Sequence, residues 1–146
     1  RRKLFPIAAE FKDKRCIIVD DSIVRGNTAK QIVRLIKQAG AKEVTLVSSC
    51  PPISNPCYYG IDFPSAAELV AHNKTEAEVA ADLGCDRIVF QTVEGLKDAL
   101  EQASLCTGCL TDTYPTDIDS GREFESRRLQ DRNEDRALAP AKHSSC

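Results

Sequence analysis

The chain has 146 residues, which suits one domain of ordinary size. Apolar residues make up 42% of it and charged residues 29%, a globular composition that argues against a disordered or fibrous protein. No apolar run approaches the roughly 18 residues of a membrane span, and no signal peptide is evident. We therefore expect a cytoplasmic protein without a membrane partner. Methionine is absent and residue 1 is Arg, so we expect a part of a longer polypeptide.

Charge is unevenly distributed along the chain. Residues 1–47 carry 11 basic and 5 acidic side chains, a net charge of +6, whereas residues 48–146 carry 9 and 17, a net charge of −8. A basic first third within a nearly balanced total favours a local anionic ligand over a nucleic-acid track. A merely solvated basic end is the alternative interpretation.

The first predicted elements are a strand, a helix and a second strand. Residues 15–19 form a β-branched apolar run of the kind found in buried parallel strands. Thr28 is expected to cap the following helix, and Gly40 to end it. Residues 44–47 form the next strand, so this part of the chain predicts a right-handed βαβ unit. The apolar residues of the helix recur at helical spacing, at Ile32, Leu35, Ile36 and Ala39.

Further helices alternate with a third strand. A loop rich in Pro, Ser and Asn covers residues 50–64. Ser65 and Thr75 each then begin a capping-box pattern, which predicts two short helices, the first through Ala71 and the second ending near Gly84. Residues 87–90 form a strand, and Thr92 is expected to cap the helix after it. This alternation predicts an α/β fold with a parallel sheet.

The composition changes towards the end of the chain. From Asp119 to Cys146 apolar residues are sparse, and Arg, Glu, Asp and Ser dominate. We therefore expect a folded part over residues 1–118 and a polar, disordered tail over 119–146, with a frayed helix around Glu123–Ala137.

The end of the first predicted strand has the features of an anion-binding loop. Open parallel sheets bind ligands beyond the carboxyl ends of their strands, where Asp20 and Asp21 lie. The loop from Ser22 to Thr28 leads into a helix N-terminus, whose unpaired N–H groups and positive dipole attract anions. Gly26 lets the backbone approach a ligand closely. The two carboxylates suit ribose hydroxyls or Mg²⁺ rather than phosphate.

Other interpretations of this loop remain open. It lacks the glycine patterns of P-loop and dinucleotide-binding proteins. An ordinary strand-to-helix turn with acidic residues at its tip is the alternative to a binding site.

His72 is expected to be a solvated or capping side chain, and no Ser-His-Asp triad is supported.

Cysteine is the second informative residue type. The seven cysteines are an odd number without a secretory signal, so a disulfide framework is not expected. Cys106 and Cys109 form a C-x-x-C pair, which indicates metal or redox chemistry and, taken alone, favours zinc. Cys16 and Cys85 lie in or beside strands and are expected to be buried apolar residues. Cys50 is not expected to bind a metal.

The segment V-D-D-S-I-V-R-G-N-T at residues 19–28 resembles the 5-phosphoribosyl diphosphate (PRPP) signature of the type I phosphoribosyltransferases. Its spelling is similar to that of one family among them, the glutamine phosphoribosylpyrophosphate amidotransferases, and the similarity extends from residue 1 to about 118. The resemblance implies part of a type I phosphoribosyltransferase fold. It also implies that Asp20 and Asp21 hold the ribose hydroxyls and help position Mg²⁺. The implied cradle for the 5′-phosphate is Ser22, Arg25, Gly26, Asn27 and Thr28, with Asn27 standing where the family usually has Thr.

The cysteine segments are also similar to this family. N-P-C-Y-Y-G around Cys57 and C-T-G-C-L-T-D-T-Y-P from Cys106 resemble the segments that bind a [4Fe–4S] cluster in one branch of the amidotransferases. Such a cluster takes four thiolates. The resemblance implies that Cys57, Cys106 and Cys109 supply three of them, the fourth lying upstream of residue 1.

The implied activity is the first step of purine synthesis, in which PRPP, glutamine and water give 5-phosphoribosylamine, glutamate and diphosphate. The implied enzyme is a homo-oligomer in which another, N-terminal domain handles glutamine. Because residue 1 is Arg and not a nucleophilic cysteine, we expect this chain alone to catalyse neither glutamine hydrolysis nor ribose-phosphate transfer. The alternatives are a nucleobase phosphoribosyltransferase, a non-catalytic PRPP-binding regulator and a zinc-stapled interaction domain.

Overall fold

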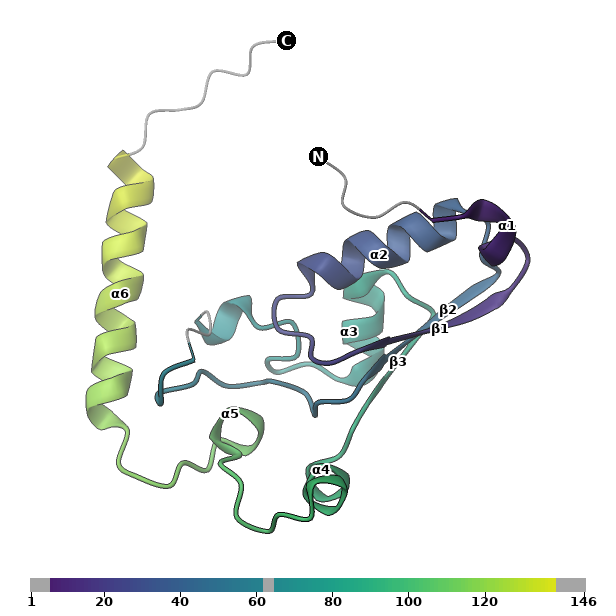
Figure 1. Ribbon diagram of the computed structural model, residues 1–146. Coiled ribbons are helices and arrows are strands. Elements are labelled where there is room, and N and C mark those ends of the chain that lie inside the picture. The colour runs from purple at the N-terminus through teal and green to yellow at the C-terminus, as the bar shows by residue number, and fades with distance from the viewer. Residues whose placement is uncertain (1–5, 62–64, 139–146) are drawn as a thin grey trace. The chain divides into compact units, whose positions relative to one another are not determined.

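The computed structural model describes residues 6–61 and 65–138, which fall into two compact units, Arg1–Tyr114 and Pro115–Cys146. Within the described residues, the first unit holds a three-stranded parallel sheet in the order β1-β2-β3 (Figure 1). The parallel α/β prediction is therefore confirmed. The strands are β1 (Arg15–Asp20), β2 (Glu43–Ser48) and β3 (Arg87–Phe90).

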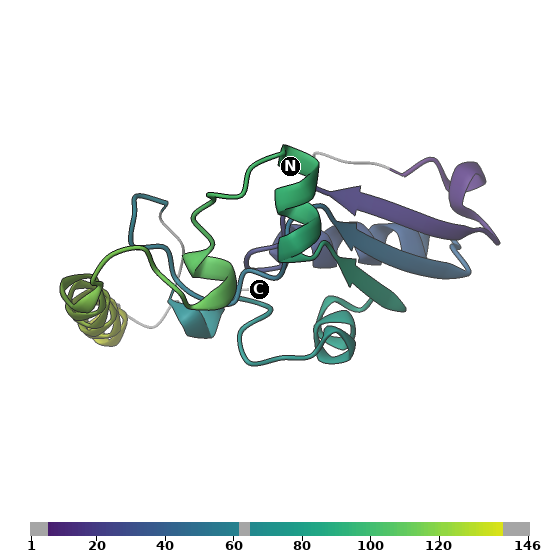
Figure 2. The same cartoon turned by 90° about the horizontal axis from the view of Figure 1, so that it is seen from below.

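Helices connect the strands and follow them. Two of these helices, α2 and α3, pack against each other and against the sheet. The helical elements of the first unit are α1 (Ala8–Phe11), α2 (Asn27–Gln38), the 3₁₀ turn η1 (Ala66–Glu68), α3 (Glu76–Leu83), α4 (Val93–Leu100) and α5 (Gly108–Thr111). Figures 1 and 2 show α5 and the segments that follow β1 and β2 beyond the carboxyl ends of the strands, the edge at which ligands bind in such sheets.

The hydrophobic core lies on one face of the sheet. Alternate residues of a strand point to opposite faces, and on β2 Val44 and Leu46 are buried against the helices. On β1, by contrast, Ile17 is 72% exposed and Val19 is 69% exposed on the other face. Burial of apolar surface, worth roughly 1.5–3 kcal/mol for each large side chain, therefore holds α2 and α3 to one side only. The helices contribute Ala29, Val33 and Ile36 from α2 and Val79, Ala80 and Leu83 from α3.

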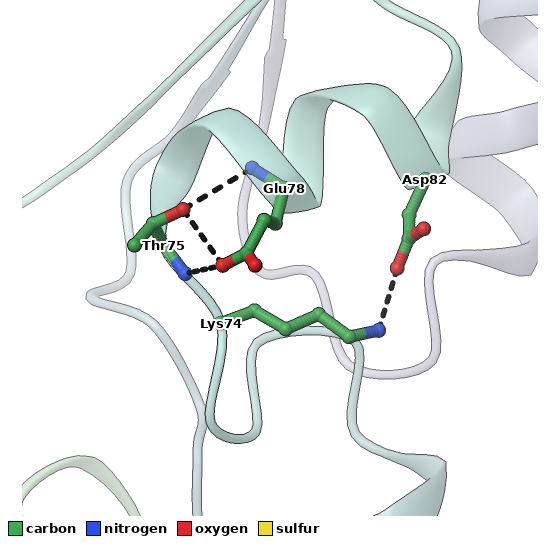
Figure 3. Close-up of polar contacts among 4 residues, drawn as sticks. All are labelled: Lys74, Thr75, Glu78 and Asp82. Carbon is green, nitrogen blue, oxygen red and sulfur yellow. Dashed lines mark hydrogen bonds and ion pairs between the residues drawn. The ribbon is translucent and has the colours of Figure 1, made fainter.

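The start and end of α3 follow the predicted pattern. The backbone N–H of Glu78 donates to the Thr75 hydroxyl over 3.3 Å, and the Thr75 N–H donates to the Glu78 carboxylate over 2.8 Å (Figure 3). This is the reciprocal capping box that the sequence predicts. Lys74 forms an ion pair with Asp82 beside it. Gly84 ends the helix with a φ of +75°, where a glycine is favoured.

The predicted cap of α2 is wrong. Thr28 lies inside the first turn, and the helix begins at Asn27 after Gly26, which has a φ of +74°. The carbonyl of Gly26 accepts the N–H of Lys30 over 2.8 Å. The left-handed turn at Gly26 therefore sets where the helix starts, and the Thr28 hydroxyl is not used as a cap.

The helix predicted from Ser65 is also wrong. Only the single turn η1 forms, and the Ser65 hydroxyl donates to the Glu68 carboxylate over 3.3 Å instead of accepting a backbone N–H. Leu69 is extended, with φ −74° and ψ +126°, so the chain leaves the helical conformation there. By contrast, Thr92 caps α4 as predicted, accepting the N–H of Gly95 over 2.9 Å.

The second unit holds the helix α6 (Asp119–Leu138), which extends beyond the frayed helix expected around Glu123–Ala137 within the polar tail. Its composition is helix-favouring, because side chains four residues apart attract one another. Glu123 and Arg127 form such an ion pair over 3.8 Å, and the Arg128 guanidinium lies 5.9 Å from the centre of the Phe124 ring. Residues 139–146 of the predicted tail lie outside the described residues. No helix in the described part of the chain has the length and apolar character to cross a membrane.

Candidate functional site

A cavity of about 490 Å³ opens where β1 ends and α2 begins. Asp20 at the end of β1 and Ile61, far along the sequence, line it together with the loop between β1 and α2. Of the seven residues predicted for PRPP binding, six line this cavity, and Asp21 is not among the lining residues. The six are Asp20, Ser22, Arg25, Gly26, Asn27 and Thr28.

The two aspartates are held by the backbone that follows each of them. Asp20 Oδ1 accepts the N–H of Asp21 over 3.1 Å, and Asp21 Oδ1 accepts the N–H of Ser22 over 2.7 Å. The N–H of Ser49, just after β2, donates to the carbonyl of Asp20 over 3.0 Å. Each of these carboxylate bonds uses one oxygen of its side chain, which leaves the second oxygen for a hydroxyl or a hydrated cation.

Gly26 is packed tightly beneath the loop. Its φ is +74°, and a Cβ at this position would lie 2.5 Å from Leu83 Cδ2 and 3.3 Å from Val70 Cγ2. Leu83 is only 2% exposed and Val70 5%, so neither can move away without disturbing the core. The loop therefore needs glycine here both for its backbone conformation and for space. The positive end of the α2 dipole faces the cavity that this turn creates.

Residues far along the sequence contact the loop or line the cavity. The N–H of Val70 donates to the carbonyl of Val24 over 2.9 Å. The Arg25 Nε lies 3.1 Å from Glu68 Oε2, and Ile61 lines the cavity with its side chain 58% exposed. Sequence analysis missed these residues because they lie more than 30 positions from the loop.

The cysteine segment lies in the loop after β2 and in α5. The carbonyl of Cys109 in α5 accepts the N–H groups of both Ser54 and Asn55, each over 3.0 Å. His72 Nδ1 lies 2.7 Å from the Ser54 carbonyl oxygen. The prediction of a solvated or capping His72 is therefore wrong, since this half-buried ring binds the loop that carries Cys57.

Aromatic packing joins the same two segments. The Tyr114 hydroxyl donates to the Pro56 carbonyl over 2.7 Å, and its ring centre lies 5.1 Å from that of Tyr58. A Cβ on Gly108 would lie 2.4 Å from the Tyr114 ring. The glycine inside the C-T-G-C pair is therefore required by packing, and the segment after β2 and α5 form one substructure.

The thiols of this substructure influence the titration of Cys109. Burial raises the pKa of the Cys109 thiol, and negative charge on Cys57, Cys50 and Cys106 raises it further. Burial and the neighbouring Asp21 raise the pKa of Cys50. Sulfur ligands of this kind suit iron–sulfur clusters and zinc. Within residues 6–61 and 65–138, however, no three His, Cys, Asp or Glu side chains are arranged to hold a metal ion.

The other cysteines behave differently. Cys85 is 8% exposed and belongs to the core, as predicted. Cys16 is half-buried and packs against that core.

The sequence pattern of the family described as phosphoribosyl transferase domain matches residues 4–88, more than half of the chain. The chain belongs to this family. The matched range contains β1, β2, the whole loop between β1 and α2, and the start of β3.

This phosphoribosyl transferase domain is similar to parts of several longer proteins. It is 48% identical over 118 residues to an amidophosphoribosyltransferase of Methanocaldococcus jannaschii, covering 81% of the chain and 25% of that protein. It is 41% identical over 133 residues to an amidophosphoribosyltransferase of Saccharomyces cerevisiae, covering 88% of the chain and 26% of that protein. The chain therefore spans about a quarter of the length of these relatives.

A solved structure shows the same fold. The chain superposes on the glutamine PRPP amidotransferase from B. subtilis, complexed with ADP and GMP, with a TM-score of 0.73 and 40% sequence identity. The match covers 81% of the chain and 27% of that protein. The phosphoribosyl transferase domain thus has a partial fold in common with that enzyme.

Proposed function

We propose that this chain is the PRPP-binding part of an amidophosphoribosyltransferase, which makes 5-phosphoribosylamine, glutamate and diphosphate from PRPP, glutamine and water. The observation that carries the proposal is the cavity after β1, whose wall contains six of the seven residues expected to bind PRPP. The similarity to amidophosphoribosyltransferases over 81% of the chain supports this choice among phosphoribosyltransferases.

The residues of the cavity divide the proposed ligand between them. The N-terminal N–H groups of α2, the Ser22 hydroxyl and the Arg25 guanidinium bind the 5′-phosphate, since helix N-termini and guanidinium groups both favour phosphate. The free carboxylate oxygens of Asp20 and Asp21 accept hydrogen bonds from the ribose hydroxyls. Mg²⁺, held beside these carboxylates, would neutralise the diphosphate. The contribution of the chain to transfer is therefore positioning and electrostatic stabilisation.

Calorimetric titration of the chain with PRPP in the presence of Mg²⁺ tests this proposal. We expect saturable binding that Asp20→Asn weakens about tenfold, or about 1.4 kcal/mol, because the ribose hydroxyls lose a charged acceptor. Asp98→Asn removes an equivalent charge from the exposed surface of α4 and should leave the affinity unchanged. Equal affinities of the wild type and Asp20→Asn would contradict the assignment.

A second assay concerns turnover. Because the chain spans about a quarter of its relatives, we propose that it binds PRPP but does not hydrolyse glutamine or form phosphoribosylamine by itself. Chromatographic detection of glutamate or diphosphate formed by the purified chain would contradict this.

We also propose that Cys57, Cys106 and Cys109 hold a [4Fe–4S] cluster together with a thiolate from outside the chain. The hydrogen bonds between their two segments, which the Cys109 carbonyl accepts from Ser54 and Asn55, support a shared ligand. Anaerobic purification should give a brown protein that contains iron and sulfide. A colourless protein with stoichiometric zinc would favour a zinc-stapled domain instead.

The remaining parts of the proposal concern the whole enzyme. Its glutamine site would lie in a further domain, its assembly would be a homo-oligomer, and its location would be the cytoplasm, although the relative from Vigna aconitifolia is named chloroplastic. Analytical ultracentrifugation and cell fractionation of the enzyme that contains this chain test assembly and location separately.

A further inference from the structure

One ion pair connects the phosphate loop to a segment that the sequence does not associate with it. Arg25 Nε lies 3.1 Å from Glu68 Oε2, 43 residues later, at the end of η1. Glu68 Oε1 in turn accepts the Ser65 hydroxyl over 3.3 Å. Next to this pair, the N–H of Val70 donates to the carbonyl of Val24 over 2.9 Å. The loop is therefore held to the η1 segment by one backbone bond and one side-chain pair.

We propose that Glu68 is a positioning residue, which holds Arg25 so that its terminal amino groups face the phosphate. This inference rests on the proposed function. An arginine has five N–H donors in a rigid planar fork, and the contact with Glu68 uses the donor on Nε. The two terminal nitrogens remain for an anion, in the geometry that binds phosphate through two parallel hydrogen bonds. Arg25 also lines the cavity.

The exposure of the pair indicates that its role is geometric rather than structural. The side chains of Arg25 and Glu68 are 49% and 41% exposed, and ion pairs in contact with water contribute little to folding. A flexible arginine, however, loses much rotamer freedom when it binds a ligand. If Glu68 orders the Arg25 side chain before the ligand arrives, this loss of conformational entropy no longer reduces the binding free energy. Loss of Glu68 should therefore change affinity much more than stability.

A double-mutant cycle tests this role. The wild type, Glu68→Ala, Arg25→Ala and the double variant are titrated with PRPP and Mg²⁺ and, separately, with inorganic phosphate, and their thermal unfolding is followed by circular dichroism. We expect Glu68→Ala to weaken both ligands about tenfold and Arg25→Ala at least as much. The double variant should bind no more weakly than Arg25→Ala, because Glu68 acts through Arg25.

Two further variants complete the test. Glu68→Gln keeps an oxygen that accepts from Arg25 Nε, so it should recover part of the affinity. Glu76→Ala removes an exposed carboxylate from the start of α3 and should bind as the wild type does.

The outcomes separate the two proposals. Unchanged affinity in Glu68→Ala, or the same tenfold loss when Arg25 is already Ala, would overturn the positioning role while PRPP binding stands. A wild-type chain that binds neither PRPP nor phosphate would overturn the proposed function and this inference with it. If Glu68→Ala is unfolded at the titration temperature, Glu68→Gln replaces it in the cycle, and a loss of affinity from Glu68→Gln that is equally large when Arg25 is already Ala overturns the positioning role.

Discussion

The phosphate loop and the cysteine segment both lie beyond the carboxyl ends of the strands, but the protein builds them in different ways. The loop is shaped by the core beneath it, because Gly26 packs on the buried side chains of Leu83 and Val70. The cysteine segment is held by hydrogen bonds to the Cys109 carbonyl and by contacts among tyrosines. Its thiols do not form a metal-binding group among the described residues.

This difference shows which site is preorganised. A site shaped by a packed core has its geometry before any ligand arrives, so ligand binding adds little to its order. A set of thiols completes its geometry when a metal binds, and metal affinity then contributes to the stability of that segment. Core substitutions should therefore damage the phosphate loop most, and metal removal should damage the cysteine segment most.

The largest effect is expected from Gly26→Ala. A side chain in the left-handed region costs about 1–2 kcal/mol, and overpacking against Leu83 adds about 1–3 kcal/mol. We expect a loss of about 2–5 kcal/mol in the free energy of unfolding, together with loss of PRPP binding, measured by urea denaturation and calorimetry. Gly84→Ala is the matched control, because its φ of +75° is similar but nothing lies within 4 Å of a Cβ there. Equal losses in the two variants would show that the core does not shape the loop.

Cys109→Ser should impair metal binding by the cysteine segment without impairing PRPP binding by the phosphate loop. Removal of a central thiol should lower metal affinity more than tenfold, which is about 1.4 kcal/mol or more. It should leave PRPP affinity within twofold of the wild type. Metal content after anaerobic purification, measured by atomic absorption, checks the first expectation, and Cys16→Ser is the control. A parallel loss of PRPP binding would mean that the two regions are one site.

The sequence predicts best what neighbouring residues decide. The strands, the capping box at Thr75 and the end of α3 at Gly84 depend on residues a few positions apart, and all were predicted. The start of α2 was misplaced because the left-handed turn at Gly26 overrides the capping preference of Thr28. Local sequence patterns fail where a tertiary contact decides the conformation. The packing of Gly26 on Leu83 is such a contact, because the residues next to Gly26 in the sequence do not indicate it.

The same limit applies to the candidate site. The six cavity residues were predicted because they are consecutive or nearly so, within one loop. Ile61 and Glu68 could not be predicted, since only the tertiary fold brings Ile61 to the cavity wall and Glu68 to Arg25. The helix α6 covers Asp119–Leu138, more than the frayed helix expected around Glu123–Ala137, because local ion pairs favour a helix even where apolar residues are sparse.

Substitution of Asp86, which lies in neither the phosphate loop nor the cysteine segment, should have a smaller effect on stability. Its carboxylate accepts the N–H of Val44 over 2.7 Å and pairs with Lys37 over 3.1 Å. We expect Asp86→Ala to lower the free energy of unfolding by about 1–2 kcal/mol, because it leaves a β2 donor without its partner. PRPP and metal binding should stay unchanged. Asp86→Asn keeps an acceptor for Val44 and should lose less.

The same residue gives a pH dependence with a defined sign. The hydrogen bond from Val44, followed by that from Lys37, lowers the pKa of Asp86 below its ordinary value of about 3.9. The folded state therefore favours the ionised carboxylate. Its contribution is complete above the unfolded pKa and is lost as the pH falls through the folded pKa. The stability difference between the wild type and Asp86→Asn should narrow below about pH 4. A difference that stays constant down to pH 2 would contradict the assigned ionic role.

The smallest effect is expected from Thr75→Ala, which weakens the helix on which the phosphate loop rests. The substitution removes the oxygen that accepts the Glu78 N–H at the start of α3, and such a loss costs about 1 kcal/mol. Because Leu83 at the other end of α3 packs beneath Gly26, hydrogen exchange in the loop should quicken along with that in α3. Exchange around Cys109 should not change, since its bonds come from Ser54 and Asn55 rather than from α3. Quickened exchange confined to α3 would show that the loop keeps its shape without that helix, and the contrast between the two regions would then rest on Gly26 alone.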